Sequence, residues 1–396
     1  MSIRYDVYEV KRDWWIKLFY LLLFFYVLSV PISGVLGWMG YPMGYHLFKV
    51  SFISLFIFFS IFVTLRGGGN PYWVLAIIIS CLSSLFISTL SFPDVNIHFF
   101  FSHLYFYLVA AIGVAAGGGV YSRYGVCFLS SDKFYKRISR LLLLFFIIYY
   151  CLYLYGAIPY WGLSSVVPLL LPFFLVNKQH SYVFCLLMVV VLSGKRSILL
   201  IILMQFLLYY LFFSDVKWLK LFMPTVLISA LSALWLVYPD FFIRFQGFVE
   251  SDISFGDRVA LLSSGRTDEI LIFWNYFSNN PHTLMFGDGF GANLIVEYFN
   301  GTVRTLHYSH FSPFGLLLLG GIPLAIICYL PILFMITKLL YRSYRSKAKH
   351  FFWGFLVLFY LAIVSLMGPA MFNDIIFWFY LGFIYKITNT DEKEYE

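Results

Sequence analysis

Residues 141–154 read LLLLFFIIYYCLYL and residues 199–213 read LLIILMQFLLYYLFF, and similar apolar runs recur along most of the 396-residue chain. Hydrophobic residues make up 61% of the sequence and charged residues 12%, whereas a soluble domain averages about 45–50% and about 25%. A membrane β-barrel would instead alternate apolar and polar residues over segments of about 10. The sequence therefore predicts an all-α, polytopic integral membrane protein and excludes soluble enzymes and nucleic-acid-binding modules.

The apolar runs are numerous enough for about twelve transmembrane helices, since one crossing needs roughly 20 apolar residues. The first run is too long for a cleavable signal and many more follow it, so we predict that it remains as the first span. We expect spans near residues 16–36, 45–65, 73–92, 98–118, 141–158, 163–177, 181–194, 197–213, 219–238, 310–331, 351–369 and 374–387.

The positions of the basic residues predict the orientation. With the N-terminus in the cytoplasm, the two densest basic clusters, 123–140 and 338–350, fall in cytoplasmic loops, as the positive-inside rule requires. The net charge of +8 then reflects topology, and we expect no nucleic-acid partner. The segment 388–396 is expected to be a cytoplasmic tail.

One segment breaks the pattern of short connections between spans. Residues 239–309 are polar and carry more acidic than basic side chains. We expect them to form a large extracytoplasmic loop that holds the catalytic groups. This loop would separate nine spans in residues 1–238 from three spans in residues 310–387.

Two cations, Lys195 and Arg196, lie between apolar runs in the sequence Ser193-Gly194-Lys195-Arg196-Ser197. The preceding run, 181–193, would rise only about 20 Å as a helix, so we expect both cations to lie below the outer headgroups. Cations at that depth are costly unless they are paired or hydrated. They would suit a lipid-linked phosphate, and the alternative is a turn whose cations snorkel to the headgroups.

A second group of motifs lies in the predicted extracytoplasmic loop. The planar fork of an arginine can hold two phosphate oxygens, and glycines let the backbone approach a ligand or adopt positive φ. The alternative is an ordinary loop in which Arg266 pairs with Asp268 or Glu269 and the glycines form a turn. The motifs are Ser264-Gly265-Arg266-Thr267, Trp274, Asn280-Pro281 and Gly287-Asp288-Gly289-Phe290-Gly291.

The third motif, His307-Tyr308-Ser309-His310, lies at the entry to the expected tenth span. Histidine suits general-base work or contact with an anion, and the alternative is an interfacial histidine that caps a helix. No third ligand is spaced convincingly near the two histidines, so we expect no metal site and no cofactor. Elsewhere, Gly113 and Gly117 match a small-xxx-small pattern for helix packing.

Taken in order, these motifs resemble those of the O-antigen polymerase and ligase superfamily. The resemblance covers mainly residues 193–325. Phe311 departs from it, because asparagine is frequent in the family after the loop histidine, and His307 competes with His310 for that role. The matching positions are Arg196, Arg266, Trp274, Asn280-Pro281, Gly287, Gly289, Gly291, His310 and Gly321.

The resemblance implies a GT-C-like, metal-independent glycosyltransferase of the bacterial inner membrane. It would join undecaprenyl-diphosphate-linked repeat units as an O-antigen polymerase, with a chain-length regulator, an O-unit flippase and membrane lipids as partners. The alternatives are a ligase that moves the glycan to lipid A core and a lipid-glycan transporter. The catalytic residues implied are His310, Arg266 and Arg196, and the substrate-binding residues are Lys195, Arg304, His307, Gly287, Gly289 and Gly291.

Overall fold

The structure is a computed structural model that describes residues 18, 21, 71–90, 97–125, 132–154, 166–193, 196–213, 266–297, 301, 303–306, 308–346, 348–368 and 370–390. Within these residues the chain is mostly helical, as the sequence predicts. The elements are α4 (Pro71–Leu90), α5 (Ile97–Tyr124), α6 (Asp132–Leu154), α7 (Val167–Val176), α8 (His180–Ser193), α9 (Arg196–Phe212), α13 (Arg266–Asn279), α14 (Pro281–Phe286), β1 (Leu294–Glu297), β2 (Val303–Leu306), α15 (Ser312–Ser346), α16 (Lys349–Met367), α17 (Ala370–Asn373) and α18 (Ile375–Asn389).

Four of the described helices are long and apolar enough to cross a membrane, namely α4, Phe99–Ser122 of α5, α15 and Lys349–Leu366 of α16. Most of α8 and α9, together with α7 and α18, are shorter apolar helices. These helices are consistent with an integral membrane protein. The predicted spans 45–65 and 219–238, and all of 16–36 except residues 18 and 21, lie outside the described residues, so the total of twelve stays a prediction.

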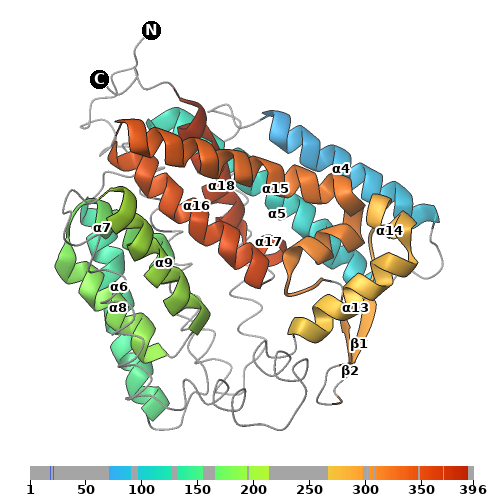
Figure 1. Cartoon of the computed structure of the whole chain (residues 1–396), viewed down its shortest axis with the longest axis horizontal. Coiled ribbons are helices and arrows are strands. Elements are labelled where there is room, and N and C mark those ends of the chain that lie inside the picture. Colours follow the sequence, from blue (N-terminus) through green and yellow to red (C-terminus); the bar gives the residue numbers. More distant parts are fainter. Residues whose placement is uncertain are drawn as a thin grey trace.

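The prediction of loops at the basic clusters 123–140 and 338–350 was wrong for most of each segment, and their cytoplasmic location stays a prediction. Helix α5 ends at Tyr124 and α6 begins at Asp132, whereas α15 continues to Ser346 and α16 begins at Lys349. A helix can extend beyond the apolar run because its backbone hydrogen bonds are internal and its charged side chains reach water. Figure 1 shows the α15–α16 turn at the opposite end of the molecule from α13, α14 and the two strands.

Small residues bring α5 and α18 into close contact. A Cβ atom at Gly113 would lie 2.5 Å from Cβ of Trp378, and one at Gly117 would collide with the backbone of Phe379. Glycines at this spacing let two helix backbones approach, which is how small-xxx-small patterns act in membrane proteins. The prediction of helix packing for Gly113 and Gly117 is confirmed.

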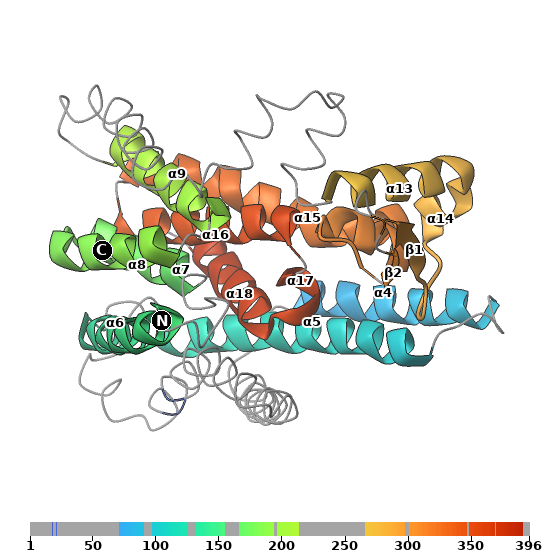
Figure 2. The same ribbon diagram turned by 90° about the horizontal axis from the view of Figure 1, so that it is seen from below.

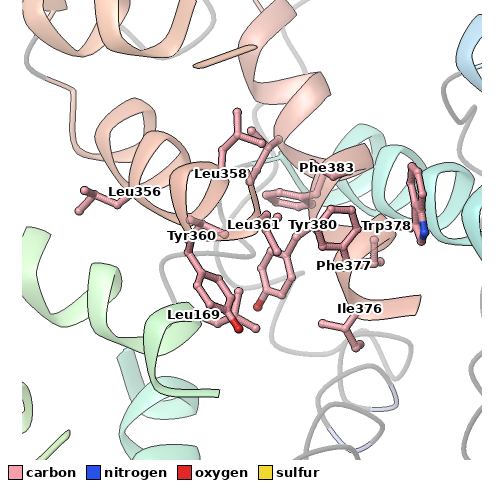
Figure 3. Close-up of a cluster of buried hydrophobic side chains, with 14 of the residues drawn as sticks. Leu169, Leu356, Leu358, Tyr360, Leu361, Ile376, Phe377, Trp378, Tyr380 and Phe383 are labelled. Carbon is pink, nitrogen blue, oxygen red and sulfur yellow. The ribbon is translucent and has the colours of Figure 1, made fainter. Parts of the chain in front are cut away.

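The main apolar core lies where α16 and α18 meet their neighbours. Figure 3 shows Tyr360 and Leu361 of α16 close to Tyr380 of α18, with Leu169 of α7 beside them. These side chains belong to one continuous cluster of buried residues that also includes Trp378. This cluster connects the α7 to α9 helices with the C-terminal helices.

Gln205 is a fully buried polar residue within the apolar helix α9. Its Nε2 donates to the carbonyl oxygens of Pro168 in α7, at 3.1 Å, and Leu356 in α16, at 3.0 Å. Pro172 has no N–H, so the Pro168 carbonyl lacks the donor that a helix normally supplies from four residues onward. Gln205 replaces that donor and joins three helices.

The described part of the predicted loop 239–309 is folded. Helices α13 and α14 precede a hairpin in which β1 pairs antiparallel with β2, Leu294 opposite Leu306. Phe273, Phe277, Val296 and Leu318 of α15 form a small apolar core of their own. Figure 2 shows these four elements (α13, α14, β1 and β2), named the external layer after the predicted location of their loop, at one end of α4 and α5. Phe273 and Phe277 both lie on α13, which places them on the side of this helix that faces α15.

Helix α15 bends where the external layer packs against it. Gly320 and Gly321 have non-helical backbone angles, and Gly321 has a φ of 65°. A Cβ atom at Gly321 would lie 2.5 Å from the carbonyl oxygen of Met285 in α14. Glycine is therefore required at this position both by conformation and by space.

Candidate functional site

Glu269 and His310 meet at the foot of α15. Nδ1 of His310 lies 2.8 Å from Oε1 of Glu269, and the backbone N–H of His310 donates to Oε2 at 3.0 Å. The side chain of Glu269 is 2% exposed, whereas that of His310 is 40% exposed. An enclosed carboxylate thus holds an imidazole that reaches the surface.

Ser309 completes the surroundings of this carboxylate. Its hydroxyl makes a longer contact of 3.4 Å to Oε2 of Glu269 and accepts the backbone N–H of Phe311 at 3.0 Å. A buried carboxylate is costly unless donors satisfy it. The two bonds from His310 and the contact from Ser309 meet that need and fix the position of Glu269.

The hydrogen-bond network assigns the tautomer of His310. An ionised carboxylate only accepts, so Nδ1 of His310 carries the proton that points at Glu269. In the neutral ring Nε2 is then unprotonated and able to accept a proton. A histidine oriented by a buried carboxylate is the arrangement that general bases use in nucleophilic reactions.

Arg266 lies one helical turn from this pair. It is the first residue of α13, and Glu269 follows three positions later. Three residues correspond to a rise of about 4.5 Å along a helix. Of the predicted catalytic residues, Arg266 and His310 are therefore brought to the same region by α13 and the segment before α15.

Arg196 is the first residue of α9. Figure 1 shows that the start of α9 and the start of α13 both lie toward the lower side of the molecule. Arg304 lies on the exposed hairpin strand β2, opposite Val296. Lys195 and His307 fall outside the described residues, so their predicted roles stay predictions.

The glycine run adopts the backbone that its composition predicts. Gly287, Gly289 and Gly291 have φ values of 78°, 80° and 84°. The backbone N–H groups of this run point at protein acceptors: that of Asp288 donates to the Leu318 carbonyl at 2.7 Å, and that of Gly291 to Nδ1 of His103 at 3.1 Å. The structure thus gives the run a packing role, and direct contact of its glycines with a substrate stays a prediction.

Asp288 ties the glycine run to the external layer. Its carboxylate accepts the hydroxyl of Tyr276 in α13 and that of Thr283 in α14, each at 2.7 Å. Burial, followed by the hydrogen bond to Asp288 and its charge, raises the pKa of Tyr276 to about 12. Tyr276 therefore stays protonated and donates to Asp288 at neutral pH.

Two polar residues of these networks are not among the predicted site residues. From the sequence, Glu269 is only a possible partner of Arg266, although its place three residues after that arginine is a signal for a site residue. His103, on α5, had no local signal, because its partner Gly291 lies 188 positions away. Among the described residues no group of three His, Cys, Asp or Glu side chains could hold a metal ion.

No protein-family model, no curated protein and no solved structure matches this chain. The resemblance to the O-antigen polymerase and ligase superfamily accordingly rests on the motif residues themselves.

Proposed function

We propose that the protein is a glycosyltransferase of the bacterial inner membrane that joins undecaprenyl-diphosphate-linked repeat units, in the manner of an O-antigen polymerase. The observation that carries the proposal is the bond between buried Glu269 and half-exposed His310, one helical turn from Arg266. Such a transfer needs a general base for the acceptor hydroxyl and a cation for the departing diphosphate.

The proposed reaction transfers a glycan from a diphosphate to a hydroxyl. The acceptor oxygen forms a bond to the anomeric carbon of the donor, and the bond from that carbon to the diphosphate oxygen breaks. His310 takes the hydroxyl proton at Nε2, and Glu269 stabilises the resulting imidazolium. Arg266 and Arg196 stabilise the charge that develops on the departing undecaprenyl diphosphate.

The distribution of charge supports an extracytoplasmic location for this reaction. The end of α15 that is remote from His310 carries Lys338, Arg342 and Arg345, and Lys349 begins α16. Basic residues mark the cytoplasmic ends of spans. The pair would then face the compartment in which lipid-linked repeat units are polymerised, and its donor would reach it through the outer leaflet.

The first experiment tests turnover directly. Purified protein is incubated with undecaprenyl-diphosphate-linked repeat unit, and we expect longer glycans together with released undecaprenyl diphosphate. His310→Gln should lower the rate about 10²–10⁴-fold, as loss of a general base does. His282→Gln is the matched control, because His282 is an exposed histidine of the same external layer. Equal loss in both variants, or no turnover by the wild-type protein, would contradict the proposal.

A genetic experiment separates polymerase from ligase. Deletion of a polymerase should leave a single repeat unit on lipid A core, whereas deletion of a ligase should leave no glycan there. Unchanged long glycan after deletion would contradict both activities.

A further inference from the structure

The loop between α14 and β1 is inserted between two membrane helices. Phe290 is 1% exposed, and its ring packs edge-on against Phe100 and Tyr107 of α5, at 5.1 Å and 5.5 Å between centroids. Its backbone N–H donates to Oγ of Ser88 in α4 at 2.9 Å. The next N–H, that of Gly291, donates to Nδ1 of His103 in α5 at 3.1 Å.

The surface that receives the loop is polar, buried and closely fitted. Ser88 and His103 are 3% and 1% exposed. A Cβ atom at Gly289 would lie 2.6 Å from the Ser84 carbonyl oxygen, so the loop backbone touches α4 directly. Because buried polar groups in an apolar environment are costly without partners, the serine and the histidine match two specific N–H groups of the loop.

The same loop is joined to the catalytic pair through α13. Asp288, adjacent to Gly289, accepts the hydroxyl of Tyr276. Tyr276 and Glu269 both lie on α13, two turns apart, and Glu269 bonds to His310. The Gly291–His103 bond, the loop backbone 288–291, the Tyr276–Asp288 bond and helix α13 therefore connect α5 to the proposed base.

We propose that His103 is a positioning residue: its bond to Gly291 fixes the external layer on α4 and α5 and so sets the place of the Glu269–His310 pair. This inference rests on the proposed glycosyl transfer for its kinetic consequence. In this proposal the glycine run 287–291 is the lock, meaning the segment that fastens the external layer to α4 and α5. The arginines bind the diphosphate. His103 acts through backbone and packing and touches neither substrate nor reacting atoms.

The choice of variants follows from the atom that His103 uses. In His103→Asn the amide oxygen can occupy the place of Nδ1 and accept the Gly291 N–H, whereas His103→Leu removes the acceptor. Phe101→Leu is a control on an exposed part of α5. Gly113→Ala is a second control, because it disturbs the packing of α5 against α18 and leaves the loop untouched.

The kinetic measurement is kcat and KM per folded protein, taken from the monodisperse fraction in lipid nanodiscs. A displacement of about 1 Å can cost about a hundredfold in rate, so we expect kcat of His103→Leu to fall roughly 10- to 100-fold with KM changed less than about threefold. His103→Asn should recover most of the rate. Wild-type kcat in His103→Leu, or a failure of asparagine to rescue it, would overturn the assignment.

Hydrogen–deuterium exchange tests the lock without using activity. The amides of residues 288–291 and those of 308–311 should both exchange faster in His103→Leu, and neither should do so in Phe101→Leu. Faster exchange in 288–291 alone would show a lock that does not position the pair, and the same gain in Gly113→Ala would show a general loss of stability. Either result would overturn the proposal. Absence of glycosyl transfer by the wild-type protein would instead contradict the proposed function.

Discussion

At one end of α15, Lys338 donates to the Asn389 side chain at 2.9 Å and Arg342 donates to the Thr390 carbonyl, beside the Phe351 ring. At the other end, the Glu269 carboxylate is buried and bonded to His310. At the basic end, these hydrogen bonds connect the last turns of α15 to the end of α18. The end with the pair encloses a charge and leaves an imidazole accessible. The basic side chains thus bond to polar groups of the fold, whereas the proposed catalytic pair combines a buried carboxylate with a half-exposed imidazole.

The first prediction is that the two ends of α15 face different compartments. We expect an impermeant thiol reagent to label Ser278→Cys, in the external layer, on cells with a permeable outer membrane, and to leave Ser346→Cys unlabelled until the cells are lysed. Both serines are exposed. Ser343, in the segment predicted as a loop, is 3% exposed and would be a poor reporter. Labelling of Ser346→Cys alone in intact cells would reverse the orientation.

The largest effect on rate should come from the buried carboxylate. Glu269→Gln keeps the shape but removes the charge that stabilises protonated His310, so turnover should fall by about 10²–10⁴. Glu297→Gln is the matched control, because Glu297 is an exposed carboxylate on β1. The measurement is release of undecaprenyl diphosphate by purified protein. Wild-type turnover in Glu269→Gln would make Glu269 a structural partner only.

The close approach of the glycine run to α4 should make the thermal midpoint of unfolding sensitive to a side chain at Gly289. Gly289→Ala and Gly301→Ala both introduce a side chain at positive φ, and this alone costs roughly 1–2 kcal/mol. Only at Gly289 would the new Cβ collide with α4, since nothing lies within 4 Å of one at Gly301. We therefore expect a clearly lower thermal midpoint for Gly289→Ala than for Gly301→Ala. Equal midpoints would show that the approach is not tight.

The proposed site and the basic end of α15 should also differ in whether lysine can replace an arginine. Arg266→Lys should lower turnover about tenfold, because a point charge cannot reproduce two parallel hydrogen bonds. Arg345→Lys, at the exposed basic end of α15, should leave turnover unchanged. Turnover is measured at saturating donor and per folded protein. Full rescue of activity by lysine at position 266 would argue against a bidentate phosphate contact.

Several features of the site were predictable because they depend on local sequence. The positive φ of Gly287 and the placement of His310 at the foot of an apolar helix follow from short motifs. The hairpin also carries a local sequence signal, because Asn300-Gly301 lies between residues 294–297 and 303–306, which form the two strands. Asn-Gly between two such segments is a strong hairpin signal.

Other features depended on partners that are distant in sequence. Glu269 bonds to a residue 41 positions away, and Ser88 to one 202 positions away. For this reason, local sequence predicted a ligand-binding role for the glycine run and predicted Glu269 only as a partner of Arg266. The same limit applies to the segment 338–350, where a basic cluster predicted a loop but most of the residues extend α15.

The sequence by itself determined the class of the protein, because the free energy of placing a helix in a membrane is a sum over about 20 consecutive side chains and needs no knowledge of their partners. It also determined which residue types could carry chemistry. The tertiary structure decided which of them meet. A buried carboxylate requires donors from elsewhere in the chain, so only the packing of α13 against the start of α15 could bring Glu269 to His310. In the same way, only the contact of the glycine run with α4 and α5 could show which acceptors the backbone N–H groups of that run reach.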